Sequence, residues 1–270
     1  MAPSMDYLPH FRREARAFED VARAAVGVEP APMVPTCPDW AMGDLIVHLG
    51  SVHRYVARLV RERLTEQPAG TDLGFLQLPE DVRGWPRPEE APNRGPVPGT
   101  LVDWYAEGVA ALAGLFSTSP DTTPVWTWSS DQTVGFWKRM QTIEASVHRW
   151  DAERTAGRAP RAVDGELAAD AVSQTFEYMV EARRKWREAP PGAGERFAFH
   201  RTDGPESWHV TFEDTHLHLH HGPAPADLEL SGTASDLMLF LWRRIPSHEL
   251  PSAKGDPSLP DRYFTLAPPI

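Results

Sequence analysis

Apolar residues recur every three to four positions in several long stretches of the first 155 residues, which is the spacing of amphipathic helices. The predicted helices cover residues 5–26, residues 40–59 with Asp39 as N-cap, residues 100–117, and a stretch from Asp131 or Thr133 to Asp151. Residues 67–99 are rich in proline and glycine and have no sustained period, so they predict a long loop. Four helices with one long crossover predict a four-helix bundle.

The pattern changes near residue 160. Residues 166–188 predict a fifth, strongly charged helix, and a capping box at Thr233 and Asp236 begins a last helix over 234–244. Between them, apolar and polar residues alternate in four short stretches that predict strands: 197–199, 208–212, 217–219 and 228–230. We therefore predict an α+β chain. A four-helix bundle in residues 1–160 is followed by a smaller α+β domain with an antiparallel sheet in residues 161–270.

Composition and charge narrow the classes of partner. The net charge is −11 and the sequence pI is near 5.4, which argues against a nucleic-acid or anionic membrane partner and favours small molecules. The first thirty residues lack the long apolar core of a signal peptide, and no later stretch approaches 18 apolar residues. We expect a cytoplasmic protein, and a monomer by default. The single cysteine, Cys37, excludes an internal disulfide and a cysteine-based zinc site, and we expect it to fill a small apolar position rather than act as a nucleophile.

Three residues are candidate metal ligands. Glu144 and His148 are four apart on a predicted helix and therefore share a face, and His48 lies on the apolar stripe of another. Two imidazoles and one carboxylate suit zinc or a similar divalent ion, and three protein ligands leave a fourth position for water or substrate. Asp151, one turn beyond His148, is placed to orient that imidazole. A histidine on an apolar helix face is, however, also common as a plain core residue.

Three segments carry a resemblance to a known family: residues 34–54 (VPTCPDW running into DLIVHLGSVHR), residues 127–153, and residues 232–244. They resemble the mycothiol-dependent maleylpyruvate isomerase family, which belongs to the DinB-like four-helix-bundle metalloenzymes. The resemblance implies a divalent metal, usually zinc, held by His48, Glu144 and His148. It also implies mycothiol, the low-molecular-weight thiol of actinobacteria, as cosubstrate.

The activity implied by this resemblance is thiol addition to an electrophilic small molecule. In the family, a cis double bond conjugated to carbonyls is isomerised, or the thiol is transferred to the electrophile. Arg139, Arg243 and Arg244 are candidates to bind the carboxylates of a substrate or the anionic part of the thiol, although Arg243 and Arg244 also suit the end of a helix. Trp137 is a candidate for a pocket wall next to the bound thiol.

Two other functions are compatible with the residues. Two histidines, one glutamate and a bound water are also the ligand set of a zinc hydrolase, and a third possibility is a metal- or small-molecule-binding protein without turnover. A requirement for added thiol would distinguish the thiol-dependent enzyme from the hydrolase and from the binding protein. His53 lies off the apolar stripe, and we expect it at the surface or beside the ligands. In the run from His216 to His221, three imidazoles, those of His216, His218 and His220, are expected on one exposed strand face, where metal binding would be adventitious.

Overall fold

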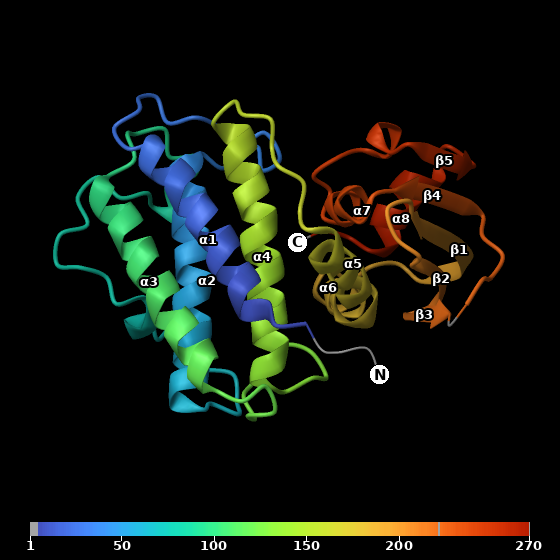
Figure 1. Ribbon diagram of the computed structural model, residues 1–270, viewed down its shortest axis with the longest axis horizontal. Helices are drawn as coiled ribbons and strands as arrows, with labels where there is room; N and C mark the ends of the chain where they lie inside the picture. Colours follow the sequence, from blue (N-terminus) through green and yellow to red (C-terminus); the bar gives the residue numbers. More distant parts are fainter. Residues whose placement is uncertain (1–4, 221, 270) are drawn as a thin grey trace. The chain divides into compact units, whose positions relative to one another are not determined.

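The computed structural model of the chain describes residues 5–220 and 222–269 (Figure 1). The chain divides into two compact units, one ending at Arg161 and the other beginning at Ala162. Among the described residues, no helix is both long enough and apolar enough to cross a membrane.

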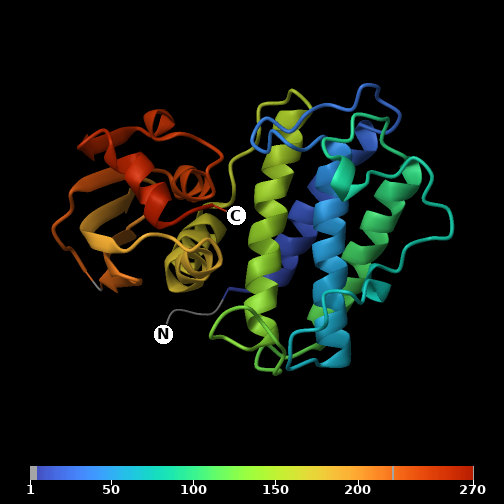
Figure 2. The ribbon, with the colours of Figure 1, turned by 180° about the vertical axis from the view of Figure 1, so that it is seen from behind.

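The first unit is a bundle of four helices: α1 (Tyr7–Ala24), α2 (Met42–Glu62), α3 (Gly99–Thr118) and α4 (Val134–Thr155). Helix α1 packs on α3 and α4, and α2 also packs on α3 and α4, so that the four helices enclose one core (Figures 1 and 2). This confirms the predicted four-helix bundle. The long connection between α2 and α3 contains only two short 3₁₀ turns, Gly74–Leu76 and Pro88–Glu90.

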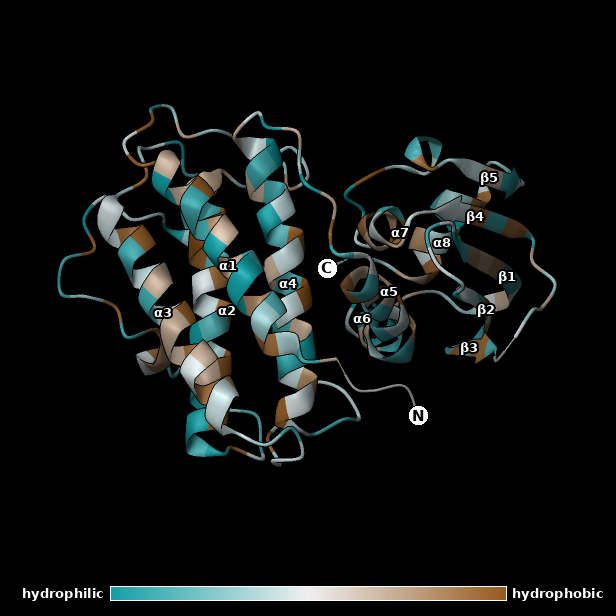
Figure 3. Ribbon diagram, viewed as in Figure 1, coloured by the Kyte–Doolittle hydropathy of each residue, from teal (hydrophilic) through white to brown (hydrophobic). Residues whose placement is uncertain are grey.

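Apolar spacing and end caps explain where these helices lie. Each of the four helices mixes hydrophobic and hydrophilic residues along its length (Figure 3), and each buries hydrophobic residues in the core. The hydroxyl oxygen of Thr133 caps α4 by accepting a hydrogen bond from the backbone N–H of Phe136. The prediction that Asp39 caps α2 is wrong. The helix starts at Met42, and the Asp44 carboxylate accepts the N–H of Ala41 at 2.8 Å, because the chain first closes a tight turn before entering the helix.

The second unit combines helices with one sheet. Its first helical run, α5 (Gly165–Gln174), a π-helical turn (Thr175–Met179) and α6 (Val180–Trp186), matches the fifth predicted helix. Helix α7 (Ala234–Leu241) begins at the predicted Thr233–Asp236 capping box. The unit also contains α8 (Leu259–Leu266), which has no clear signal in the proline-rich C-terminal sequence. The strands are β1 (Gly192–Arg201), β2 (Ser207–Asp214), β3 (His216–His220), β4 (Leu228–Gly232) and β5 (Ser252–Gly255).

The five strands form one sheet in the order β3-β2-β1-β4-β5. The α+β class is confirmed, but the sheet is mixed rather than antiparallel throughout, because β1 and β4 pair in parallel. Alternation of apolar and polar residues shows that a strand is half-buried, but it does not indicate whether the strand runs parallel or antiparallel to its neighbour. The direction of β4 depends on the connection that carries the chain from β3, at one edge of the sheet, to the far side of β1.

The histidines of β3 behave as the sequence predicts. His216, His218 and His220 alternate with Leu217 and Leu219 and lie on the exposed side of the strand. His221, the fourth histidine of this run, lies outside the described residues.

Candidate metal centre

The three candidate ligands converge at the contact between α2 and α4. The Glu144 Oε2 atom lies 3.2 Å from His148 Nε2 and 3.9 Å from His48 Nε2. One ligand atom from each residue lies within 4.8 Å of the other two. Two ligands on the same tetrahedral zinc, each at about 2.0–2.1 Å, are roughly 3.3 Å apart. The spacing of these three side chains therefore suits one shared divalent ion.

Burial and pairing set the charges of this group. Burial alone raises the pKa of Glu144, but hydrogen bonds with His148 and His48 outweigh this effect, so the pKa lies below its ordinary value. Burial alone lowers the pKa of His148, yet its hydrogen bonds with Asp151 and Glu144 dominate and raise the pKa. Glu144 is therefore held as an anion at neutral pH, which is the state a metal ligand requires.

Asp151 fixes the orientation of His148. The Nδ1 atom of His148 lies 2.9 Å from Asp151 Oδ2, and the Asp151 side chain is fully buried. Because an ionised carboxylate only accepts hydrogen bonds, His148 donates its Nδ1–H to Asp151, while Nε2 lies 3.2 Å from Glu144 and donates to it when the imidazole is protonated. The proton held on Nδ1 leaves Nε2 as the nitrogen that a metal would bind, with release of the Nε2 proton.

Two residues beside the group were not singled out from the sequence. The Thr36 hydroxyl donates to Asp151 Oδ1 at 2.6 Å, and the Trp40 ring lies with its centre 4.8 Å from that of His48 and 6.5 Å from that of His148. Both lie in the segment Val34–Trp40, so a signal was present in the quoted motif. Helical periodicity gives no information about Thr36 and Trp40, because both belong to the turn before α2.

Arg139 and Trp137 lie on α4 but at a distance from the ligands. Arg139 is five residues before Glu144, which places it about 140° around the helix axis and therefore on a different side. Trp137 is about two turns before Glu144, or roughly 10 Å along the axis. It is buried, and its Nε1–H donates to the carbonyl of Trp126 at 2.8 Å. The described contacts of Trp137 fit a core residue.

Arg243 and Arg244 belong to the second unit. The Arg243 guanidinium lies over the Phe264 ring at 5.3 Å, and Arg244 Nη1 donates to the carbonyl of Trp242 at 2.8 Å. Arg243 and Arg244 lie two and three residues beyond the last residue of α7, near the helix end at which the helix dipole favours cations. These contacts all lie within the second unit and do not add either residue to the group around His148.

His53 corrects one expectation. It is fully buried in the bundle, with its ring centre 5.2 Å from that of Phe11 and 5.7 Å from that of Tyr105. Neither ring nitrogen has a hydrogen-bond partner within the described part of the chain, and burial lowers its pKa to about 3. The expectation of a surface position is wrong because α2 packs against both α3 and α4, so its buried side is wider than one apolar stripe.

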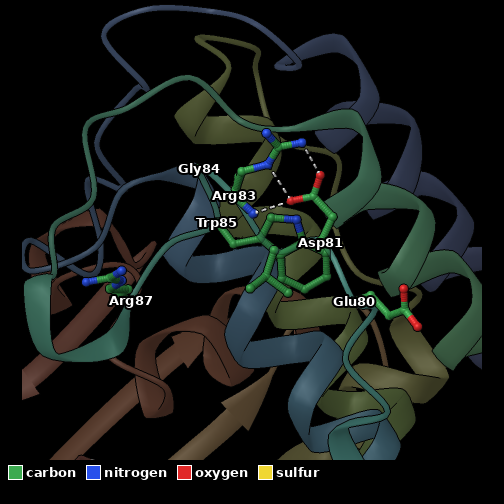
Figure 4. A pocket seen from close by; sticks show the side chains of 7 residues that line it. Glu80, Asp81, Arg83, Gly84, Trp85 and Arg87 are labelled. Carbon is green, nitrogen blue, oxygen red and sulfur yellow. Dashed lines mark hydrogen bonds and ion pairs between the residues drawn. The ribbon is translucent and has the colours of Figure 1, made fainter.

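A hollow elsewhere on the first unit is separate from these residues. It has a volume of about 680 Å³ and is lined by residues 80–85 and Arg87 of the long loop, as Figure 4 shows. Arg83 and Asp81 face one another there and form an ion pair at 2.6 Å. Asp81 and Arg83 therefore satisfy one another's charge within the hollow.

Comparison with known proteins identifies the family of this chain. Residues 11–153 match the mycothiol maleylpyruvate isomerase N-terminal domain, and residues 166–262 match the C-terminal domain of the same proteins. The crystal structure of a mutant of the mycothiol-dependent maleylpyruvate isomerase shares the fold, with a TM-score of 0.58, 12% sequence identity and 92% of each chain covered. A search of curated protein sequences finds no match. The two matched domains together span most of the chain, which therefore belongs to the mycothiol maleylpyruvate isomerase family.

Proposed function

We propose that this protein is a thiol-dependent isomerase that uses mycothiol to isomerise a double bond conjugated to a carbonyl in a small molecule. His48, Glu144 and His148, in a metal-binding domain of residues 1–160, hold a divalent metal, with zinc favoured. Membership of the family supports the thiol and the reaction class. The observation that carries the proposal in this chain is the convergence of these three side chains from α2 and α4.

The donor set fits such an ion. Two neutral imidazoles and a carboxylate are ligands that zinc and its neighbours accept, and three protein ligands leave one position for an exogenous group. When bound, a divalent ion there supplies a Lewis acid that favours the thiolate form of a thiol, whose free pKa is about 8.5.

The residues of the chain prepare this site. Asp151 accepts the Nδ1–H of His148 and so directs Nε2, which lies 3.2 Å from Glu144, toward the position of the metal, where it binds after losing its proton. The carboxylate of Glu144 supplies one negative charge among the three ligands. The Trp40 ring packs against His48 and removes part of the water around that imidazole. A drier site strengthens every electrostatic interaction in it.

The isomerisation then follows from reversible addition. The thiolate sulfur forms a bond to one carbon of the C=C, and the π electrons move toward the conjugated carbonyl oxygen. The remaining C–C bond is single and rotates. The electrons return, the S–C bond breaks, and the trans alkene and the thiolate are released. The thiol is regenerated, so it is needed only in catalytic amounts, which distinguishes isomerisation from transfer of the thiol to the electrophile.

A spectroscopic titration tests this proposal. The protein is loaded with Co²⁺, mycothiol is added, and the near-ultraviolet spectrum is recorded. We expect a saturable sulfur-to-cobalt charge-transfer band in the wild type and in His218→Ala, and none in His148→Ala. Maleylpyruvate is then offered with and without thiol, and isomerisation should require it. A fully loaded protein that shows no band, or turnover independent of thiol, would contradict the proposal.

A further inference from the structure

Thr36 connects a turn of the chain to the candidate metal centre. Its hydroxyl donates to Asp151 Oδ1 at 2.6 Å, across 115 positions of sequence. The other carboxylate oxygen, Oδ2, faces His148 Nδ1 at 2.9 Å. The Asp151 side chain is fully buried, and each of its oxygens has a different partner. Thr36, Asp151 and His148 therefore form a chain of hydrogen bonds that ends at a candidate ligand.

The turn that contains Thr36 is closed by its own backbone. The N–H of Val34 donates to the carbonyl of Trp40 at 2.9 Å, and the N–H of Trp40 donates to the carbonyl of Cys37 at 2.8 Å. Trp40, at the end of the turn, packs its ring on His48 at 4.8 Å. The turn thus reaches both histidines of the candidate site, one through packing and the other through Asp151.

We propose that Thr36 is a positioning residue for the metal centre, which acts by fixing the Asp151 carboxylate that holds His148. The inference rests on the proposed function, since it assumes that His148 binds a metal. The terminal torsion of an aspartate is broad, and each hydrogen bond on a different carboxylate oxygen narrows the rotation that remains. Removing the Thr36 hydroxyl should therefore loosen the imidazole of His148 through Asp151.

Two substitutions separate this role from a merely structural one. Thr36→Val keeps the shape of the side chain and removes the hydroxyl, whereas Thr36→Ser keeps the hydroxyl. Zinc affinity of each purified protein is measured by competition with a chromophoric chelator. We expect Thr36→Val to weaken zinc binding about fivefold, below the roughly 10–100-fold that follows from mutating a residue in contact with a metal ligand. Thr36→Ser should stay within about twofold of the wild type, as should the exposed control Thr118→Val.

A double-mutant comparison tests whether Thr36 acts through Asp151. If it does, Thr36→Val combined with Asp151→Asn should bind zinc no more weakly than Asp151→Asn alone. The Co²⁺ d–d spectrum should shift in Thr36→Val and return to the wild-type form in Thr36→Ser.

Each outcome has a defined meaning. Unchanged zinc affinity in Thr36→Val, or additive effects in the double variant, would overturn the role of Thr36 and leave the proposed function intact. A wild-type protein that binds no zinc and no Co²⁺ would overturn both proposals together. Weaker zinc binding in Thr36→Ser equal to that in Thr36→Val would also overturn the role of the hydroxyl, because packing alone would then explain the loss.

Discussion

Two groups of histidines in this chain differ in almost every respect except residue type. His48 and His148 come from two helices of the bundle, lie with their ring centres 5.0 Å apart, and share the carboxylate of Glu144. His216 and His218 follow one another along a single strand of the second unit, with ring centres 6.5 Å apart. One group is brought together by packing, and the other is close only because its members are close in sequence.

The surroundings of each group decide what it can bind. In the bundle, the buried Asp151 fixes the ring of His148. On β3, His218 lies 3.6 Å from Glu213, but the two side chains are 53% and 69% exposed. Exposed pairs of this kind contribute little, because solvent screens them and the side chains keep their freedom. The candidate metal site is therefore distinguished by two histidines from different helices that meet at Glu144, and not by the number of histidines.

The largest expected effect comes from removing one histidine of the bundle. His148→Ala deletes a candidate ligand and should weaken zinc binding by at least about a hundredfold, beyond the usual effect of changing a residue behind a ligand. The measurement is zinc content by elemental analysis together with competition against a chelator. His218→Ala is the matched control, and it should keep one zinc per chain at wild-type affinity. If His148→Ala retained zinc and His218→Ala lost it, the zinc site would lie on β3 and not in the bundle.

A smaller effect is expected from neutralising the shared acid in metal-free protein. The pKa of Glu144 is lowered, so its contribution to stability is present above its unfolded value of about 4.3 and is lost as pH falls through the folded value. The pKa of His148 is raised, so its contribution is present below about 6.5 and is lost as pH rises through the folded value. Both act together between about pH 4.3 and 6.5.

In that window Glu144→Gln should lower the free energy of unfolding by about 2 kcal/mol, the scale of a hydrogen bond to a charged group. Denaturant unfolding in the presence of chelator, at pH 5.5 and at pH 8.5, gives the two values. We expect the loss at pH 8.5 to be smaller, because His148 is then less protonated. Equal losses at both pH values would show that the pairing with protonated His148 does not contribute.

The smallest effect concerns His53, whose ring nitrogens have no hydrogen-bond partner among the described residues. Its folded pKa of about 3 lies below its unfolded value of about 6.5, so wild-type stability is lost as pH falls below about 6.5. One pH unit corresponds to at most about 1.4 kcal/mol. His53→Leu should therefore lose about 1.4 kcal/mol less than the wild type between pH 7.5 and 5.5, as measured by denaturant unfolding. An acid response identical to the wild type would show that this imidazole is hydrated or paired.

The sequence by itself determined the four helices of the bundle, and in the second unit the first helical run, α7 and strands β1 to β4, but neither β5 nor α8. Their apolar spacing is a local property, and so are the caps at Thr133 and Thr233, because a helix needs its partners within three or four residues. The pairing of Glu144 with His148 was visible for the same reason, since one helical turn separates them. His48 was a candidate ligand from its place on the apolar stripe of its helix, and the motifs around it supported that role through resemblance without revealing what lies next to it.

Only the tertiary structure decided the contacts that join distant segments. It placed Thr36 on Asp151 and Trp40 on His48, buried His53 among three helices, and paired β4 in parallel with β1. None of these contacts follows from the periodicity of apolar residues. Periodicity shows which side of a helix or strand is apolar, but it does not show which residues that side contacts. Turns and strand directions depend on how the whole chain packs. The residues around the candidate metal site are therefore set by long-range packing of the helices and not by local sequence.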